Sequence, residues 1–292
     1  MSSVNNIKSL SDIVEQYEAF ILDQWGVMHD GFKGYPDAIS CIKKLIELDK
    51  KLIIISNSSK RKKTTIKKLP KLGFNPNNFI EVMTSGEMIW QCLYTRTDPL
   101  IKKLSKNCYY LSDLKNEDEL EFKDGLNFNF VKDINKADFI LACSINKNYT
   151  TLDYVPLIKQ AIENNILFIC ANPDFETIET SSINSNICMG TIARLYNDLG
   201  GDVFMLGKPN KKIYFEATKN IKEIKKSKIL AIGDSVHHDI QGAINFGIDS
   251  LLISSGLHSL EFDNENPKWK ANTKKMLKYE KTPTFLCSKF KF

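Results

Sequence analysis

Several apolar runs in this chain end at a polar residue. The run FIL at positions 20–22 comes directly before Asp23, and Gly26 follows soon after. Short, continuous apolar runs are typical of buried parallel strands, and a glycine just beyond them indicates a turn. A carboxylate at the end of such a strand faces the crevice in which open α/β sheets bind ligands. Asp23 is therefore a candidate functional residue, although a single aspartate in this position is more often a turn cap.

Three further apolar runs end in the same way. KLIII comes before Ser56, VFMLG before Lys208 and ILAIG before Asp234. Because parallel strands end at the same edge of a sheet, we expect these side chains to lie near Asp23. The strands alternate with segments of helical periodicity, which predicts an α/β protein with a parallel sheet. These helices are expected at 36–49, 60–68, 211–221 and 239–246.

A second group of strands and helices lies between Ser56 and Lys208. Because it interrupts the series of polar strand ends, an inserted domain is the simplest explanation. We therefore expect a core in two parts, residues 1–104 and 202–292, and an inserted α/β domain formed by residues 105–201. In the core, a helix is also expected over 83–104 and a strand over 203–206; in the insert, strands are expected at 108–111, 128–131, 139–143 and 167–171, and helices at 113–120, 152–164 and 190–199.

Composition and charge narrow the class of protein. The net charge of +5 comes largely from dispersed lysines, so neither nucleic acid nor a membrane surface is expected as a partner. Residues 60–68 hold six basic side chains, but no aromatic residues are interleaved with them, so we interpret them as a solvated helix face. The seven cysteines are odd in number and form no CxxC pair, which predicts reduced thiols. Since no apolar run is long enough to span a bilayer and the N-terminus does not resemble a signal peptide, we expect a soluble, cytoplasmic protein.

The polar strand ends suit chemistry on phosphorus. A carboxylate can attack phosphorus only when the negative charge of its target is neutralised, which takes a divalent cation, a lysine and hydrogen-bond donors. Asp23 is the candidate nucleophile, and Ser56 and Lys208 are candidates to hold the phosphoryl oxygens. Asn57 directly follows Ser56, at the start of a predicted helix, where an anion binds well. We therefore include Asn57 among the substrate-binding candidates.

Two further carboxylates are expected to hold a metal ion. Asp234 lies in a turn that begins with a glycine, and Asp239 lies at the start of the next predicted helix. This spacing allows both side chains to reach one cation, together with Asp23. Carboxylate oxygens are the protein ligands that Mg2+ prefers, so the sequence predicts a Mg2+ site.

These four segments resemble the four motifs of the haloacid dehalogenase (HAD) superfamily of phosphohydrolases. The matching stretches are DQWGV from Asp23, ISNSS around Ser56, GKPN around Lys208 and GDSVHHDIQGAINFG over 233–247. Because the insert lies between the second and third motifs, the chain is similar to the class IIA branch, which carries a type II α/β cap and includes NagD-like and nitrophenylphosphatase-like enzymes. The stretches NPD and MGTIARLYNDLGG, both before GKPN, strengthen the resemblance.

The resemblance implies a fold and an activity. The fold would be a Rossmann-like, doubly wound parallel sheet with an inserted α/β cap. The activity would be a Mg2+-dependent phosphatase that acts on a small phosphorylated metabolite through a phosphoaspartyl intermediate on Asp23. The resemblance further implies that Asp174 and its neighbours face the substrate, that the backbone carbonyl of Trp25 is a Mg2+ ligand, and that the protein forms a homodimer through the cap.

Trp25 departs from the family pattern. The phosphatases of the family usually carry a second aspartate two residues after the nucleophile, which protonates the leaving oxygen and later activates water. General acid–base catalysis contributes roughly 10²- to 10⁴-fold to a rate. Alkyl phosphates are therefore expected to turn over slowly, whereas esters with a good leaving group need the proton far less. His29 and Asp30, in the following loop, are candidate replacements.

Two alternative functions stay open. One is a catalytically weak or inactive HAD-like protein that binds a phosphorylated ligand or partner, because Trp25 removes the usual acid. The other is hydrolysis of a carbon–halogen bond, because an aromatic residue at position 25 resembles the dehalogenases of the superfamily. Those enzymes do not need the Asp234 and Asp239 pair, and their cap is inserted elsewhere, so we prefer the phosphatase.

Overall fold

The computed structural model describes residues 4–112, 117–146, 148–176, 187–256 and 282–292. In these residues the chain forms two compact units, each built on its own sheet. The expected α/β class with a doubly wound parallel sheet is confirmed. The first unit comprises Met1–Ser56, Ile66–Met83 and Lys208–Phe292, and the second comprises Asn57–Thr65 and Thr84–Gly207.

The sheet of the first unit has seven strands. β2 lies near its middle, between β10 and β3, and the pairs from β1 through to β3 are all parallel. Leu22 is in register with Ile232 on one side and with Ile54 on the other. Asp23, Asp234 and Ser56 therefore all lie at the same edge of the sheet. In spatial order the strands are β1 (Asn5–Asn6), β12 (Phe285–Cys287), β11 (Asp249–Ile253), β10 (Ile229–Gly233), β2 (Ala19–Leu22), β3 (Lys51–Ser56) and β4 (Glu81–Thr84).

Helices cover both faces of this sheet because alternate strand residues point to opposite sides. Phe20 and Leu22 lie in a buried cluster with the apolar side of α1 (Pro36–Glu47). Leu252 belongs to a separate cluster with Ile240. The helices of the first unit after Lys208 are α8 (Lys211–Ala217), a π-helical turn (Val236–Ile240) and α9 (Gln241–Phe246).

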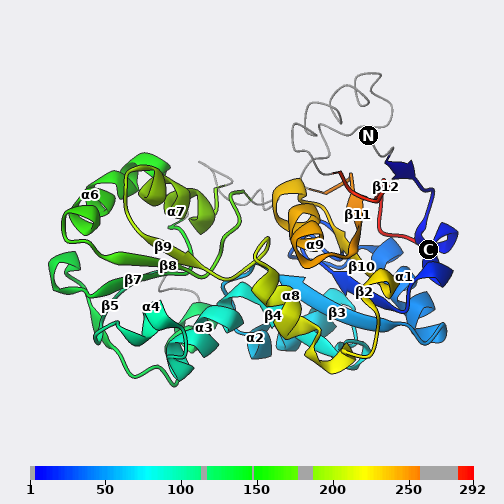
Figure 1. Cartoon of the computed structure of the whole chain (residues 1–292), viewed down its shortest axis with the longest axis horizontal. Coiled ribbons are helices and arrows are strands. Elements are labelled where there is room, and N and C mark those ends of the chain that lie inside the picture. The colour runs from blue at the N-terminus through cyan, green and yellow to red at the C-terminus, as the bar shows by residue number, and fades with distance from the viewer. Residues whose placement is uncertain (1–3, 113–116, 147, 177–186, 257–281) are drawn as a thin grey trace. The chain divides into compact units, whose positions relative to one another are not determined.

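The second unit contains a five-stranded parallel sheet (Figure 1). Helices α6 and α7 pack through buried apolar side chains on β7 and β8, and Figure 1 shows α3 and α4 on the other side of the sheet. In spatial order the strands are β6 (Asn129–Val131), β5 (Asn107–Leu111), β7 (Phe139–Ala142), β8 (Leu167–Cys170) and β9 (Val203–Met205). The helices are α2 (Lys62–Lys68), which begins here and continues into the first unit, α3 (Ser85–Thr95), α4 (Pro99–Lys102), α5 (Glu117–Lys123), α6 (Val155–Glu163) and α7 (Met189–Asp198).

Two expected elements are divided or paired differently in the structure. The segment 83–104 is not one helix: β4 ends at Thr84, whose hydroxyl oxygen caps α3, and Arg96 ends α3 in a left-handed conformation (φ 51°). The strand at 203–206, which was expected in the core, is β9 and pairs with β8. Periodicity identifies a strand, but it does not determine which sheet the strand joins.

No helix in the described part of the chain is long and apolar enough to cross a bilayer. The seven cysteines carry free thiols.

Candidate active site

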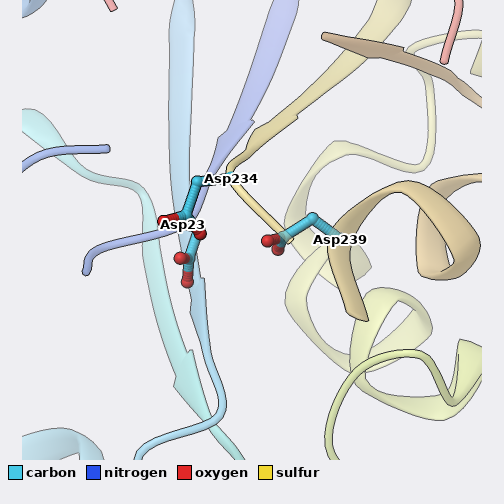
Figure 2. Close-up of side chains that lie close together, drawn as sticks. All are labelled: Asp23, Asp234 and Asp239. Carbon is cyan, nitrogen blue, oxygen red and sulfur yellow. The ribbon is translucent and has the colours of Figure 1, made fainter. Parts of the chain in front are cut away.

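Three carboxylates come together at the carboxyl edge of the seven-stranded sheet. Asp23 follows β2, Asp234 follows the neighbouring β10, and Asp239 lies in the π-helical turn. One oxygen from each carboxylate lies within 4.8 Å of the others. Figure 2 shows the three side chains directed toward the same space, although they come from separate segments of the chain. π-helical turns are rare and occur frequently at functional sites.

Lys208 joins two of these carboxylates. Its Nζ donates to Oδ1 of Asp23 at 2.6 Å and to Oδ1 of Asp239 at 2.7 Å, and all three side chains are buried. Three carboxylates and one ammonium leave an excess of two negative charges, which is costly to bury without compensation. A divalent cation would balance this excess, and carboxylate oxygens are the ligands that Mg2+ prefers. The donor set therefore fits the expected Mg2+ site.

Glycines make room for the carboxylates. A Cβ built on Gly26 would lie 1.9 Å from Oδ2 of Asp234, and one built on Gly256 would lie 2.2 Å from the same oxygen. Gly26 also has a φ of +75°, which residues with a side chain rarely adopt. On the other side of the cluster, a Cβ on Gly233 would lie 2.1 Å from Cγ of Asp239. Sequence reasoning did not single out Gly256, because it follows no motif and no strand end with a polar residue.

The π-helical turn is held by hydrogen bonds from several directions. The amide of Ser235 donates to Oδ2 of Asp239 at 3.1 Å, and the hydroxyl of Tyr214 donates to the backbone carbonyl of Asp239 at 3.2 Å. Burial and the nearby Asp239 carboxylate raise the pKa of Tyr214, so its hydroxyl keeps its proton and acts as a donor. The ring Nδ1 of His238 lies 3.2 Å from the carbonyl oxygen of Lys208. Tyr214 and His238 were not predicted, because neither lies at a strand end.

The candidate substrate-binding residues fall into two groups. Ser56 is buried at the end of β3, in the same sheet as Asp23. Asn57 begins the second unit, where its Nδ2 donates to Oδ1 of Asp174 at 2.8 Å. The structure thus brings Asn57 and Asp174 together across a long stretch of sequence. Gly207 passes beside this pair, since a Cβ on it would lie 2.5 Å from Oδ1 of Asn57.

Trp25 is packed into the loop that follows Asp23. Its ring meets that of His29 edge to face, with centroids 5.3 Å apart. Gly31, at a φ of +93°, lies so close to the indole that a Cβ there would be 2.3 Å from two ring atoms. The amide of Gly31 donates to Nδ1 of His29 at 3.0 Å, so the neutral imidazole carries its proton on Nε2. In this form His29 can donate a hydrogen bond from Nε2, whereas general-acid catalysis would require the imidazolium.

Asp30, the other candidate replacement, accepts hydrogen bonds from the backbone of the loop. Its Oδ1 accepts from the amides of Phe32 and Lys33, both at 2.9 Å. The hydrogen bonds from Lys33 and then Phe32 lower the pKa of Asp30 below its ordinary value. An ionised carboxylate that caps a turn is a poor source of protons. Of the two candidate replacements for the missing acid, His29 is the one whose side chain still carries a proton.

One basic residue of the 60–68 segment is not solvated. Arg61 is buried, its guanidinium lies 3.5 Å from the ring centroid of Trp90, and its Nε donates to Oε2 of Glu87 at 2.8 Å. The interpretation of this segment as a solvated face is therefore wrong for Arg61. Its partners come from α3, which the local charge pattern does not indicate.

Comparisons with known proteins extend the resemblance over most of the chain. Residues 20–123 match a family described as haloacid dehalogenase-like hydrolase, and residues 205–287 match one described as HAD-hydrolase-like. A 4-nitrophenylphosphatase of Schizosaccharomyces pombe is 24% identical over 277 residues, which cover 87% of this chain and 89% of that protein.

Solved structures show the same fold. A haloacid dehalogenase-like hydrolase from Brucella suis has 27% sequence identity and a TM-score of 0.80, with 97% of this chain and 99% of that chain covered. A 4-nitrophenylphosphatase from Thermotoga maritima has 20% identity and a TM-score of 0.66, with 95% of this chain and 96% of that chain covered.

Proposed function

Because the chain belongs to the class IIA branch of the haloacid dehalogenase-like hydrolases, we propose that it is a Mg2+-dependent phosphatase of a small phosphorylated metabolite. The single observation that carries this proposal is the buried cluster in which Lys208 bridges Asp23 and Asp239 beside Asp234. The 4-nitrophenylphosphatases to which the chain is similar support the choice of a phosphate ester over a carbon–halogen bond.

The proposed reaction has two chemical steps. A carboxylate oxygen of Asp23 attacks phosphorus, the bond to the leaving oxygen breaks, and the leaving group departs with the electron pair. Water then attacks the phosphoaspartyl group, which releases phosphate and restores Asp23. Lys208 and Ser56 hold the phosphoryl oxygens.

The proposed Mg2+ ligands are the carboxylates of Asp23, Asp234 and Asp239 and the backbone carbonyl of Trp25. When bound, the ion supplies charge neutralisation for the phosphoryl group. Gly26 and Gly256 contribute indirectly, because their missing side chains let the Asp234 carboxylate lie between them.

Trp25 indicates a preference among phosphate esters. With no carboxylic acid at this position, the leaving group must depart with little help unless His29 supplies the proton. Esters of aromatic alcohols, and phosphoanhydrides, have leaving groups that are stable as anions. We therefore expect these substrates to react faster than alkyl phosphates.

Asn57 and Asp174 are proposed to contact the part of the substrate beyond the phosphoryl group. The hydrogen bond between them fixes both polar side chains in one place. Homodimerisation through the cap, expected at residues 105–201 and implied by the family resemblance, is kept as a prediction.

Trp25 also favours a second candidate function, a catalytically weak HAD-like protein that binds a phosphorylated ligand or partner. Such a protein would keep the anion site of Ser56 and Lys208 but turn over slowly, because proton transfer is worth roughly 10²- to 10⁴-fold. Binding of phosphate esters without measurable hydrolysis would distinguish it from the phosphatase.

Hydrolysis of 4-nitrophenyl phosphate tests the proposed function. We expect turnover with Mg2+, none after chelation, and none in Asp23→Asn. Asp37→Asn, an exposed aspartate of α1, is the control and should behave as the wild type. Chelation should also lower the melting temperature, because it removes a ligand that binds only the folded state. Turnover that is unaffected by both chelation and Asp23→Asn would refute the proposal.

A further inference from the structure

The loop formed by residues 57–62, which follows Ser56 and begins the second unit, is fixed by the start of α3. The amide of Gly86 donates to the carbonyl of Ser58 at 3.0 Å. The two backbones approach so closely that a Cβ on Gly86 would lie 1.9 Å from the carbonyl oxygen of Ser59. Short polar loops are usually mobile, so contacts of this kind are needed to hold one in place.

Glu87 binds the C-terminal end of the same loop. Its carboxylate accepts from Nε of Arg61 at 2.8 Å, from the amide of Lys62 at 3.1 Å and from Nε2 of Gln91 at 3.1 Å. Burial acts to raise the pKa of Glu87, but the hydrogen bonds from Arg61 and Lys62 outweigh it and the pKa lies below its ordinary value. Glu87 is therefore an ionised acceptor that binds both a side chain and the backbone of the loop.

Two side chains hold the guanidinium of Arg61. Its Nε–H donates to the Glu87 carboxylate, and the Trp90 ring lies against its plane. Trp90 is itself fixed, because Tyr94 stacks on it with centroids 4.8 Å apart and its Nε1 donates to the carbonyl of Asp124 at 3.0 Å. The guanidinium therefore links the loop to α3 and, through Trp90, to the segment after α5.

We infer that Arg61 is a positioning residue: held between Glu87 and Trp90, it fixes the loop of residues 57–62 and so the orientation of Asn57 toward the substrate. Only an arginine supplies both an Nε–H and a flat cationic face, so a lysine would not replace it. The hydrogen bond from Asn57 to Asp174 is the contact that this fixation preserves. The role in substrate binding rests on the proposed phosphatase function, whereas the fixation of the loop does not.

The test compares Arg61→Lys and Arg61→Met with the wild type, with Lys63→Met as a matched control. Lys63 lies in the same basic segment, but its side chain is exposed and its ion pair with Asp124 is long, at 3.4 Å. Amide hydrogen exchange of the peptide that covers residues 57–62 should become faster in both Arg61 variants and stay unchanged in Lys63→Met. Peptides from β2 and β10 should exchange as in the wild type, because those strands belong to the first unit.

Kinetics with 4-nitrophenyl phosphate supply the second measurement. Misplacement of a substrate-binding group by about 1 Å can cost up to about 10²-fold, so we expect KM to rise toward that limit in the Arg61 variants while kcat changes much less. Glu87→Gln keeps a hydrogen-bond acceptor and should give a smaller rise in KM. If Arg61→Met does not fold, Arg61→Lys carries the test, since it keeps the charge.

Loop exchange as slow as in the wild type in either folded Arg61 variant would overturn the inference. So would faster exchange spread evenly over all peptides, which indicates general destabilisation. If the wild type does not hydrolyse the ester, the proposed function fails, and hydrogen exchange still decides whether Arg61 fixes the loop.

Discussion

The indole of Trp25 stands where the phosphatases of the family usually carry an acid, and the surrounding loop is built to hold it. Gly31 lies against the ring and His29 meets it edge to face, so the loop holds the indole where it lies. An acid at this position would need a different loop packing. The protein therefore gives up proton donation by residue 25 and is left with His29 as the nearby proton carrier.

Replacing Trp25 tests this interpretation. Trp25→Asp should raise the rate for alkyl phosphates, with an upper bound of about 10²- to 10⁴-fold, while changing the first chemical step for aryl phosphates little. The gain will be smaller than the bound, because exchanging an indole for a carboxylate leaves a void. Steady-state kinetics on a matched alkyl and aryl pair measure the effect. Trp25→Phe, which adds no acid, is the control.

One result would contradict this role for Trp25. If Trp25→Asp leaves alkyl-phosphate turnover unchanged while Asp23→Asn abolishes it, another group already transfers the proton. His29→Asn would then identify that group, because it removes the Nε2 proton donor.

Glycines at the proposed metal site give a second test, and a glycine elsewhere in the chain supplies its control. Gly26→Ala and Gly256→Ala should both weaken Mg2+ binding, because each Cβ would overlap the Asp234 carboxylate. Gly200 has a similar positive φ (+95°) with nothing within 4 Å of the built Cβ, so Gly200→Ala should cost about 1–3 kcal/mol of stability and leave Mg2+ affinity unchanged. Isothermal titration calorimetry with Mg2+ measures the affinity of each variant. Normal affinity in Gly256→Ala would show that Asp234 is not a ligand.

The sequence identified polar residues that follow apolar runs and missed the residues that support them. For Asp23 and Ser56 the local pattern was sufficient, because β2 and β3 pair in one sheet. Lys208 also follows an apolar run, but β9 before it belongs to the other sheet, so its contact with Asp23 does not follow from the strand-end argument. Arg61 and Tyr214 act through partners far along the chain, and a single sequence does not show such pairings. This is why the charge pattern predicted a solvated face where Arg61 is buried.

At the scale of elements, the π-helical turn is the feature that places Asp239. An ordinary α-helical start was expected from 239 onward, whereas the structure has the turn at Val236–Ile240 followed by α9. From this turn the Asp239 carboxylate accepts from Lys208, and the hydroxyl of Tyr214 on α8 donates to the Asp239 backbone carbonyl. Hydrophobic spacing does not distinguish a π-helical turn from the first turn of an α-helix.

Removing the Tyr214 hydroxyl tests the role of this turn. Tyr214→Phe should lower the free energy of unfolding by about 1 kcal/mol and weaken Mg2+ binding by about tenfold, the lower end of the effect for partners of metal ligands. Tyr196→Phe is the matched control, since the buried Tyr196 hydroxyl also donates to a backbone carbonyl, that of Ile166, but in the second unit. Equal Mg2+ affinities in the two variants would show that Tyr214 only stabilises the fold.

At the scale of the whole molecule, the alternation of strands and helices was sufficient to predict two α/β units, but not their boundaries. The short segment Asn57–Thr65 belongs with the second unit, although it directly follows a strand of the first. Tertiary contacts with α3 place it there, and these contacts have no local sequence signal. The same limit explains why β9 was assigned to the wrong sheet.

Buried thiols make the folded state sensitive to alkaline pH. Burial is the main cause that raises the pKa of Cys41, Cys108 and Cys170 to about 12, from 9.0. Above pH 9 the unfolded chain loses these protons while the folded chain keeps them, so stability falls as pH rises, by up to about 1.4 kcal/mol per pH unit for each thiol. Urea unfolding at about pH 8 and about pH 11 measures the loss, and Cys170→Ala should reduce the slope. Equal stability at both pH values would contradict the burial of these groups.

The central claim is that the Asp23 carboxylate itself attacks phosphorus, and the mass of the Asp23 peptide tests it most directly. Because no carboxylate at position 25 is available to take a proton from the attacking water in the second step, the phosphoaspartyl form should accumulate. Acid quenching during turnover of 4-nitrophenyl phosphate, followed by digestion and mass spectrometry, should show this peptide with the added mass of one phosphoryl group, and Asp23→Asn should show neither the added mass nor turnover. Continued hydrolysis by Asp23→Asn, with no phosphorylated peptide in the wild type, would contradict it.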